Sequence, residues 1–237
     1  PYAVLAAAAW TALIVHSLAL IRLLQLSSPA LPVGAYTYSQ GLEWAVESRR
    51  IHDEGSAGHW IGDLLTGAIG RFEAPLLVQL MLCWGDGNSA EIVRLNADFL
   101  ASRESAELRA ESLQMGYSLK RLLADLRDPH LATTRELLAE FPESAFPTVW
   151  SGLAAAWQIE PLAAVSAYLW AWAENQVMAA LKAVPLGQAS GQRLLAEIGR
   201  SIPAVAEVAM QLPEAAWSNL TPGFAICCAR HETQYSR

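Results

Sequence analysis

The residues best suited to metal chemistry are two adjacent cysteines and a histidine near the end of the chain. Cys227 and His231 are four residues apart, so on a helix their side chains share one face and could reach the same soft or borderline cation. A closed tetrahedral site needs two further ligands, and the other histidines are scattered along the chain. We therefore interpret Cys227 and Cys228 as small buried side chains beside a surface His231, and we predict no metal site and no cofactor.

Two groups of carboxylates could suggest acid–base catalysis. Asp53 and Glu54 are adjacent, and Glu104, Glu107 and Glu111 are three and four residues apart. We interpret the first pair as the start of a helix and the three glutamates as a solvated stripe on a helix surface. The chain also lacks the GxxxxGK[ST], HExxH, CxxC and GxSxG motifs of nucleotide, zinc, redox and serine chemistry. The sequence predicts a protein that is not an enzyme, and an uncharacterised helical enzyme is only the third reading.

The elements that must position these side chains are helices. Breaks rich in proline and glycine separate segments rich in Ala, Leu, Glu and Arg, in which apolar residues recur three and four positions apart. We expect one long amphipathic helix in residues 102–126, with Leu108, Met115 and Leu119 on one face. Residues 161–182 are apolar all round, which predicts a helix in the middle of the molecule. The fold class is all-α, a single-domain bundle of roughly ten helices.

The composition limits the possible partners. The chain has 237 residues, of which 53% are hydrophobic and 16% charged, so it can bury a core and still present apolar surface to other proteins. Its net charge of -7 excludes the basic patch that nucleic-acid binding requires. An odd number of cysteines, with two of them adjacent, favours a reducing, cytoplasmic compartment.

The first residues differ from the rest of the chain. Residues 3–21 carry no formal charge and are long enough to span a membrane. Thr11, His16 and Ser17 interrupt this run, and no basic region precedes it. We expect an apolar leader over residues 1–21 and a helical bundle over residues 22–229. The alternative is a membrane-anchored helical protein that uses the apolar N-terminal segment.

Three stretches together resemble the UreF family of urease accessory proteins. Residues 23–34 read LLQLSSPALPVG and residues 36–43 read YTYSQGLE, which resembles the opening motif of that family. Residues 181–188 read LKAVPLGQ, similar to its central helix-ending motif, and residues 230–237 read RHETQYSR, similar to its C-terminal signature. The stretches occur in the expected order and spread over nearly the whole chain.

The resemblance implies a helical, homodimeric protein that binds a UreD/UreH-like accessory protein and a UreG-like GTPase and supports nickel delivery to apo-urease. It assigns Lys182 to control of the GTPase, whereas its place at a helix end equally suggests pairing with the helix dipole. Residues 230–237 follow a Pro222–Gly223 break and are rich in charge, so we expect a tail that is solvated alone and ordered by a partner. Its predicted partner-binding residues are Arg230, His231, Glu232, Tyr235 and Arg237.

Overall fold

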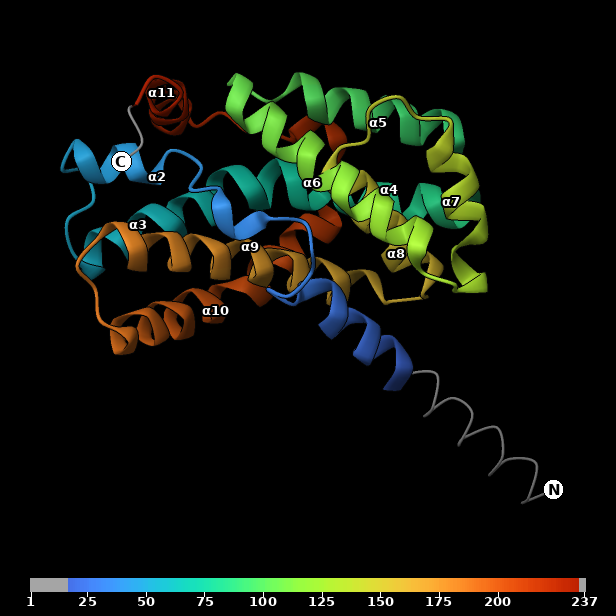
Figure 1. The fold of residues 1–237 in the computed structure, drawn as a ribbon, viewed down its shortest axis with the longest axis horizontal. Helices are drawn as coiled ribbons and strands as arrows, with labels where there is room; N and C mark the ends of the chain where they lie inside the picture. Colours follow the sequence, from blue (N-terminus) through green and yellow to red (C-terminus); the bar gives the residue numbers. More distant parts are fainter. Residues whose placement is uncertain (1–16, 235–237) are drawn as a thin grey trace, which may run out of the picture.

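The structure is a computed structural model that describes residues 17–234, and within this range every regular element is helical. A helix over residues 17–27 comes first, and ten α-helices follow (Figure 1). They are α2 (Leu42–Glu47), α3 (Glu54–Leu64), α4 (Ala74–Asp86), α5 (Ser89–Ala101), α6 (Ala106–Asp125), α7 (Ala132–Ala139), α8 (Phe146–Ala156), α9 (Pro161–Ala183), α10 (Gln188–Gln211) and α11 (Pro222–His231). Short segments between them are the 3₁₀ helices η1 (Ala35–Thr37), η3 (Pro129–Leu131) and η4 (Glu214–Ala216) and the π-helical η2 (Leu65–Glu73). The predicted all-α, single-domain bundle is confirmed.

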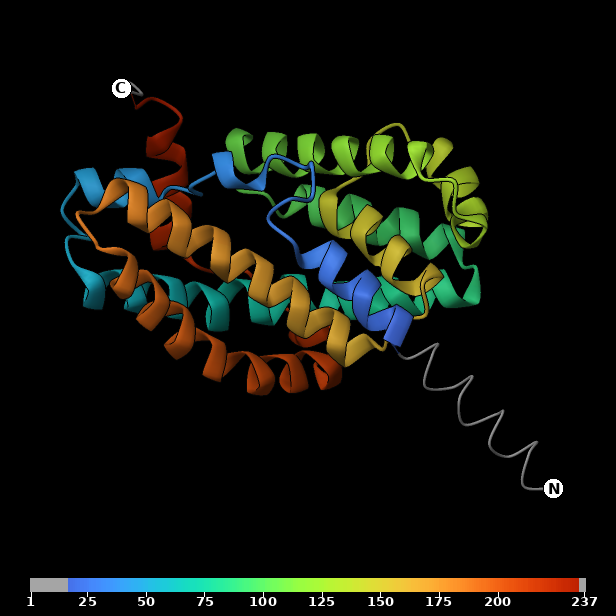
Figure 2. The same cartoon turned by 60° about the horizontal axis from the view of Figure 1, so that its bottom comes forward.

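The helix α9 runs through the middle of the bundle, as predicted. It contacts α10, α4, α2 and α3, and Figures 1 and 2 show α9 and α10 side by side along much of their length. The Glu160 carboxylate caps its first turn by accepting hydrogen bonds from the backbone amides of Leu162 and Ala163 at 3.1 and 2.9 Å. The helix ends at Ala183, one residue beyond the predicted end. Its buried side chains include Tyr168 and Trp172, which form part of the site described below.

The segments α3, η2 and α4 follow one another without a break and form one long rod. Asp53 caps the rod, because its carboxylate accepts a hydrogen bond from the Ser56 amide at 2.8 Å. The prediction that Asp53 and Glu54 start a helix is therefore confirmed. A Cβ added to Gly70 in η2 would lie 2.5 Å from Val205 Cγ1, so the missing side chain lets α10 pack closely against the rod.

The long amphipathic helix predicted in residues 102–126 is α6. Ser105 is its N-cap and accepts a hydrogen bond from the Leu108 amide at 3.1 Å. The apolar face is buried as expected, but the prediction of a solvated glutamate stripe is wrong for Glu111, which is 7% exposed. Glu104 is exposed and Glu107 is half-buried. The physical reason is spacing: Glu111 is three residues from Leu108 and therefore lies on the buried face.

The helix over residues 17–27 packs on the bundle beside α8. The guanidinium of Arg22 pairs with Asp128 at 3.0 Å, and the Trp150 indole donates to the Leu26 carbonyl at 3.4 Å. Most of the leader predicted over residues 1–21 lies outside the described residues. Across residues 17–234, no helix combines the length and the apolar character needed to cross a membrane.

Candidate partner-binding site

The loop between the first helix and α2, residues 28–41, brings distant parts of the chain together. Gly41 adopts φ +76°, a left-handed conformation that favours glycine. A Cβ added there would lie 2.9 Å from the Cys228 amide nitrogen and 3.1 Å from its Sγ. Gly41 thus permits both the turn and the close approach of α11 to the start of α2.

Lys182 holds the same loop from the other side. Its ammonium donates a hydrogen bond to the Tyr36 carbonyl at 3.2 Å and lies 5.7 Å from the centre of the Tyr36 ring. Both side chains are exposed. The end of α9 and the loop therefore form one surface, although 146 residues separate the two positions.

His231 ties α11 to two other helices. Its Nδ1 lies 2.7 Å from the Glu107 carboxylate of α6, and its Nε2 lies 3.5 Å from Glu43 of α2. Burial lowers the pKa of His231, but the hydrogen bonds and charges of Glu107 and Glu43 outweigh it, so the pKa is raised overall. Beside this pair, Glu232 accepts a hydrogen bond from the Glu107 amide at 3.0 Å.

These contacts show that part of the prediction for residues 230–237 is wrong. The expectation that the charges of residues 230–237 are solvated in the isolated chain is wrong for His231, which is half-buried and paired. The carboxylate of Glu232 is also engaged, whereas Arg230 is exposed. Tyr235 and Arg237 lie outside the described residues. The helix α11 continues to His231, so the predicted boundary at residue 229 falls inside it.

Cys227 and Cys228 are buried, as predicted, with exposed fractions of 0% and 1%. Burial raises the pKa of the Cys228 thiol, and the nearby Glu107 and Glu111 raise it further, so this cysteine is a protonated core residue. In the part of the chain that the structure describes, no three His, Cys, Asp or Glu side chains are grouped so that they could hold a metal ion.

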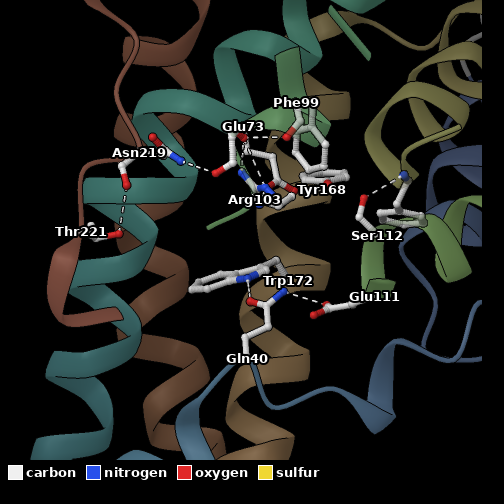
Figure 3. A network of polar contacts seen from close by, with 12 residues as sticks. Gln40, Glu73, Phe99, Arg103, Glu111, Ser112, Tyr168, Trp172, Asn219 and Thr221 are labelled. Atoms are coloured by element: carbon white, nitrogen blue, oxygen red, sulfur yellow. Dashed lines mark hydrogen bonds and ion pairs between the residues drawn. The ribbon is translucent and has the colours of Figure 1, made fainter. Parts of the chain in front are cut away.

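Beneath this surface lies a buried polar network, drawn in Figure 3. The guanidinium of Arg103 pairs with Glu73 at 3.2 Å and lies 4.1 Å from the centre of the Phe99 ring. The Tyr168 hydroxyl donates a short hydrogen bond to the other oxygen of Glu73. Burial and the charge of Glu73 raise the pKa of Tyr168, so the phenol stays neutral and acts as a donor.

A second part of the network centres on Gln40, at the end of the loop. Its amide Nε2 donates to Glu111 at 2.8 Å, and its Oε1 accepts from the Trp172 indole at 2.9 Å (Figure 3). Gln40 has φ +50°, a strained value for a residue with a side chain. The hydrogen bonds to α6 and α9 hold it in this conformation and fix the loop to both helices.

Known proteins are similar to this chain over most of its length. A model of the UreF family matches residues 51–199. The urease accessory protein UreF of Dechloromonas aromatica (strain RCB) is 70% identical over 220 residues, covering 93% of this chain and 96% of that protein. The urease accessory protein UreF of Azoarcus sp. (strain BH72) is 62% identical over 221 residues, covering 93% of this chain and 94% of that protein. The chain belongs to the UreF family.

As a UreF protein, the chain is a urease accessory protein and not an enzyme. The three stretches that carried the resemblance lie in contact. The opening stretch meets the central one through Tyr36 and Lys182, and it meets the C-terminal one through Glu43 and His231. Sequence reasoning selected Lys182 and His231 but gave no sign that the opening stretch contacts both of them.

The buried network of this UreF chain was missed from the sequence. Glu73 interrupts an apolar run, and Glu111 falls at the spacing of buried leucines, so both could have been suspected. Gln40, Arg103 and Tyr168 carried no such signal. They lie around one cavity although Gln40 is in the loop at residues 28–41, Arg103 is between α5 and α6, and Tyr168 is on α9.

Proposed function

We propose that this chain binds a UreD/UreH-like accessory protein and a UreG-like GTPase and supports nickel insertion into apo-urease. The observation that carries the proposal is that the opening stretch contacts both other family-like stretches, through Tyr36 and Lys182 on one side and through Glu43 and His231 on the other. A surface built from distant segments can engage two partners at once and is suited to a bridging protein.

The two sides of this surface differ in chemistry. Lys182 and Tyr36 present an exposed cation beside an exposed ring, a combination typical of a protein interface. We assign this side to the GTPase. The α11 end presents the exposed side chains of Arg230 and Glu232. We assign the α11 end to the UreD/UreH-like protein.

We further propose that the chain is a homodimer in the cytoplasm. Support comes from large apolar side chains on the surface of α9, where Trp170 and Met178 are 36% and 43% exposed. The three cysteines are free and buried, which suits a reducing compartment. Light scattering measures the molar mass of the purified protein and so tests the homodimer. Met178→Glu should shift the molar mass toward that of a monomer.

Co-purification with the two partners tests the function. A tagged chain expressed with UreD/UreH-like and UreG-like proteins should retain both through gel filtration. Lys182→Ala should reduce retention of the GTPase only, and removal of residues 230–237 should reduce retention of the UreD/UreH-like protein. If neither partner is retained by the wild-type chain, the proposed function is wrong.

A further inference from the structure

A cavity of about 90 Å³ lies inside the bundle, beneath the loop at residues 28–41. This space could hold roughly six water-sized groups, which is enough for a small organic molecule. Its lining includes the aromatic side chains of Phe146, Trp150, Tyr168 and Trp172. Its polar lining includes Gln40, Glu111 from α6, Glu174 and Gln176 from α9, and the Arg103–Glu73 pair.

Trp172 determines which way these polar groups point. An indole N–H can only donate, so the Gln40 atom that meets it at 2.9 Å must be the acceptor Oε1. Gln40 Nε2 therefore donates to Glu111 Oε1 at 2.8 Å. Gln176 Nε2 donates to the same Gln40 Oε1 at 3.3 Å. Consequently, the second oxygen of Glu111 and the amide oxygen of Gln176 are both left without a donor, and the Glu111 oxygen is an acceptor when the carboxyl is ionised.

These two acceptors have no protein partner. Glu111 Oε2 and Gln176 Oε1 are buried and lack a hydrogen-bond donor anywhere in residues 17–234. The residues themselves are only 7% and 1% exposed, and both line the cavity. Buried acceptors of this kind favour a ligand that brings N–H donors.

An ionised Glu111 would favour a cation as its partner. Arg103 also lines the cavity, but its guanidinium pairs with Glu73, which Tyr168 also contacts, so its charge is already neutralised. Within the described residues, no ion pair to Glu111 occurs. The aromatic walls add to the preference, because ring faces attract organic cations.

We propose that this cavity binds a small primary alkylammonium ion. Its ammonium group donates to Glu111 Oε2 and Gln176 Oε1, and its alkyl chain packs against the aromatic rings. One carboxylate oxygen and one amide oxygen are too few ligands for a divalent metal ion. This inference goes beyond the proposed function and does not depend on it, since the purified chain alone should bind the ion.

Binding should depend on pH in a defined way. Burial raises the pKa of Glu111 to about 8; the Gln40 hydrogen bond and Arg103 lower it, while Glu73 and Glu107 raise it. The empty site is therefore protonated at neutral pH, and the ammonium ion must displace one proton. Affinity should rise roughly tenfold per pH unit well below pH 8 and become constant above it. The other titratable groups near this site are Tyr36, Tyr38, Tyr168 and Glu174 in its lining and Cys228 close to Glu111.

The test is a titration of the purified chain with n-propylammonium chloride at constant ionic strength, followed by saturation-transfer NMR of the ligand. We expect saturable binding that tightens roughly tenfold from about pH 6 to about pH 7. n-Propanol, which has the same shape without the charge, should bind at least roughly tenfold more weakly.

A matched pair of variants locates the site. Glu111→Gln places an amide NH2 where Oε2 lies, because Gln40 still requires an acceptor. This variant should lose at least roughly tenfold in affinity and all pH dependence. Glu207→Gln removes an exposed carboxylate from α10 and should change neither. Circular dichroism checks that both variants are folded.

Three results would overturn the proposal: no saturable binding, equal binding of n-propanol, or unchanged affinity in Glu111→Gln. The first means that the cavity holds solvent only. If Glu111→Gln does not fold, the pH dependence and the n-propanol comparison on the wild-type chain decide the question, because an apolar cavity without an ionising carboxylate shows neither effect.

Discussion

The imidazole of His231 lies 2.7 Å from the carboxylate of Glu107, although 124 residues separate the two in the sequence. Together with Glu43, this contact joins the last described helix to α6 and α2. The family-like C-terminal stretch is therefore anchored at its start. This arrangement allows the stability of the anchor and the affinity of the tail for a partner to be measured separately.

The anchor should depend on pH. The pKa of His231 is raised in the folded protein, because Glu107 and Glu43 outweigh the effect of burial. Its stabilising contribution is therefore fully present below the unfolded pKa of about 6.5 and is lost as pH rises through the folded pKa. We expect His231→Gln to reduce the free energy of unfolding by about 1–2 kcal/mol near pH 6 and much less near pH 9.

Urea unfolding at both pH values measures this difference. His59→Gln, which changes an exposed histidine on α3, serves as the control. Its free energy of unfolding should differ little from that of the wild-type chain at either pH. A loss in His231→Gln that is the same at both pH values would show that the imidazole acts by packing rather than by charge.

Gly41 and Gly34 form a matched pair for testing the approach of α11. Both have φ +76°, but an added Cβ meets the Cys228 backbone at 2.9 Å only at Gly41, and nothing within 4 Å at Gly34. Gly34→Ala should destabilise the fold by about 1 kcal/mol, the cost of a left-handed alanine. Gly41→Ala should cost about 2–3 kcal/mol and expose the amides of α11 to hydrogen exchange. Equal losses would contradict the close packing.

Lys182→Ala should leave the fold nearly unchanged. An exposed charge at a helix end contributes about 0.3–1 kcal/mol, and its hydrogen bond to the Tyr36 carbonyl is also exposed. Under the proposed function, urease activation or its dependence on GTP should change. The control is Arg200→Ala, which removes an exposed cation from α10. Normal activation at every GTP concentration would leave Lys182 with a structural role alone.

Removing residues 230–237 should abolish binding to the UreD/UreH-like protein while the bundle stays folded. Loss of buried interfacial charge pairs typically costs about 2–5 kcal/mol each, enough to take a nanomolar complex to micromolar. Because His231 is also lost, the thermal midpoint should fall by a few degrees. Arg230→Ala separates the effect on binding from the effect on stability. Because Arg230 is exposed, this substitution should weaken binding to the partner without changing the stability of the fold. Unchanged affinity after the truncation would exclude the tail as a docking element.

The purified chain should neither bind GTP tightly nor hydrolyse it. The sequence contains no GxxxxGK[ST] loop to hold the phosphates. Phosphate release measured with the purified protein alone should stay at the background rate. Adding the UreG-like GTPase should produce GTP hydrolysis. Saturable GTP hydrolysis by the chain alone would contradict this prediction.

The sequence predicted the helices better than the contacts between them. The spacing of apolar residues predicted α6 and α9 to within a few residues, because side chains three and four positions apart share the buried face of a helix. For Glu111 two local signals conflict, because its spacing from Leu108 favours the buried face of α6 whereas glutamates are usually solvated. The hydrogen bond between Trp172 and Gln40 spans 132 residues, and no local pattern could have indicated it.

The π-helical segment η2 also bears on how this chain can change over evolution. Each residue of an α-helix advances the side chains by about 100°. A π-helix has more residues per turn than an α-helix, so η2 holds about one residue more than regular α-helix would need between α3 and α4. Deleting one residue between Leu65 and Glu73 would therefore convert η2 to regular α-helix and leave the buried faces of α3 and α4 close to their present directions. Deleting one residue elsewhere in α3 or α4 would instead turn one helix by about 100° relative to the other and expose part of its buried face. In sequence alignments of relatives, a one-residue gap across these three segments should fall within η2.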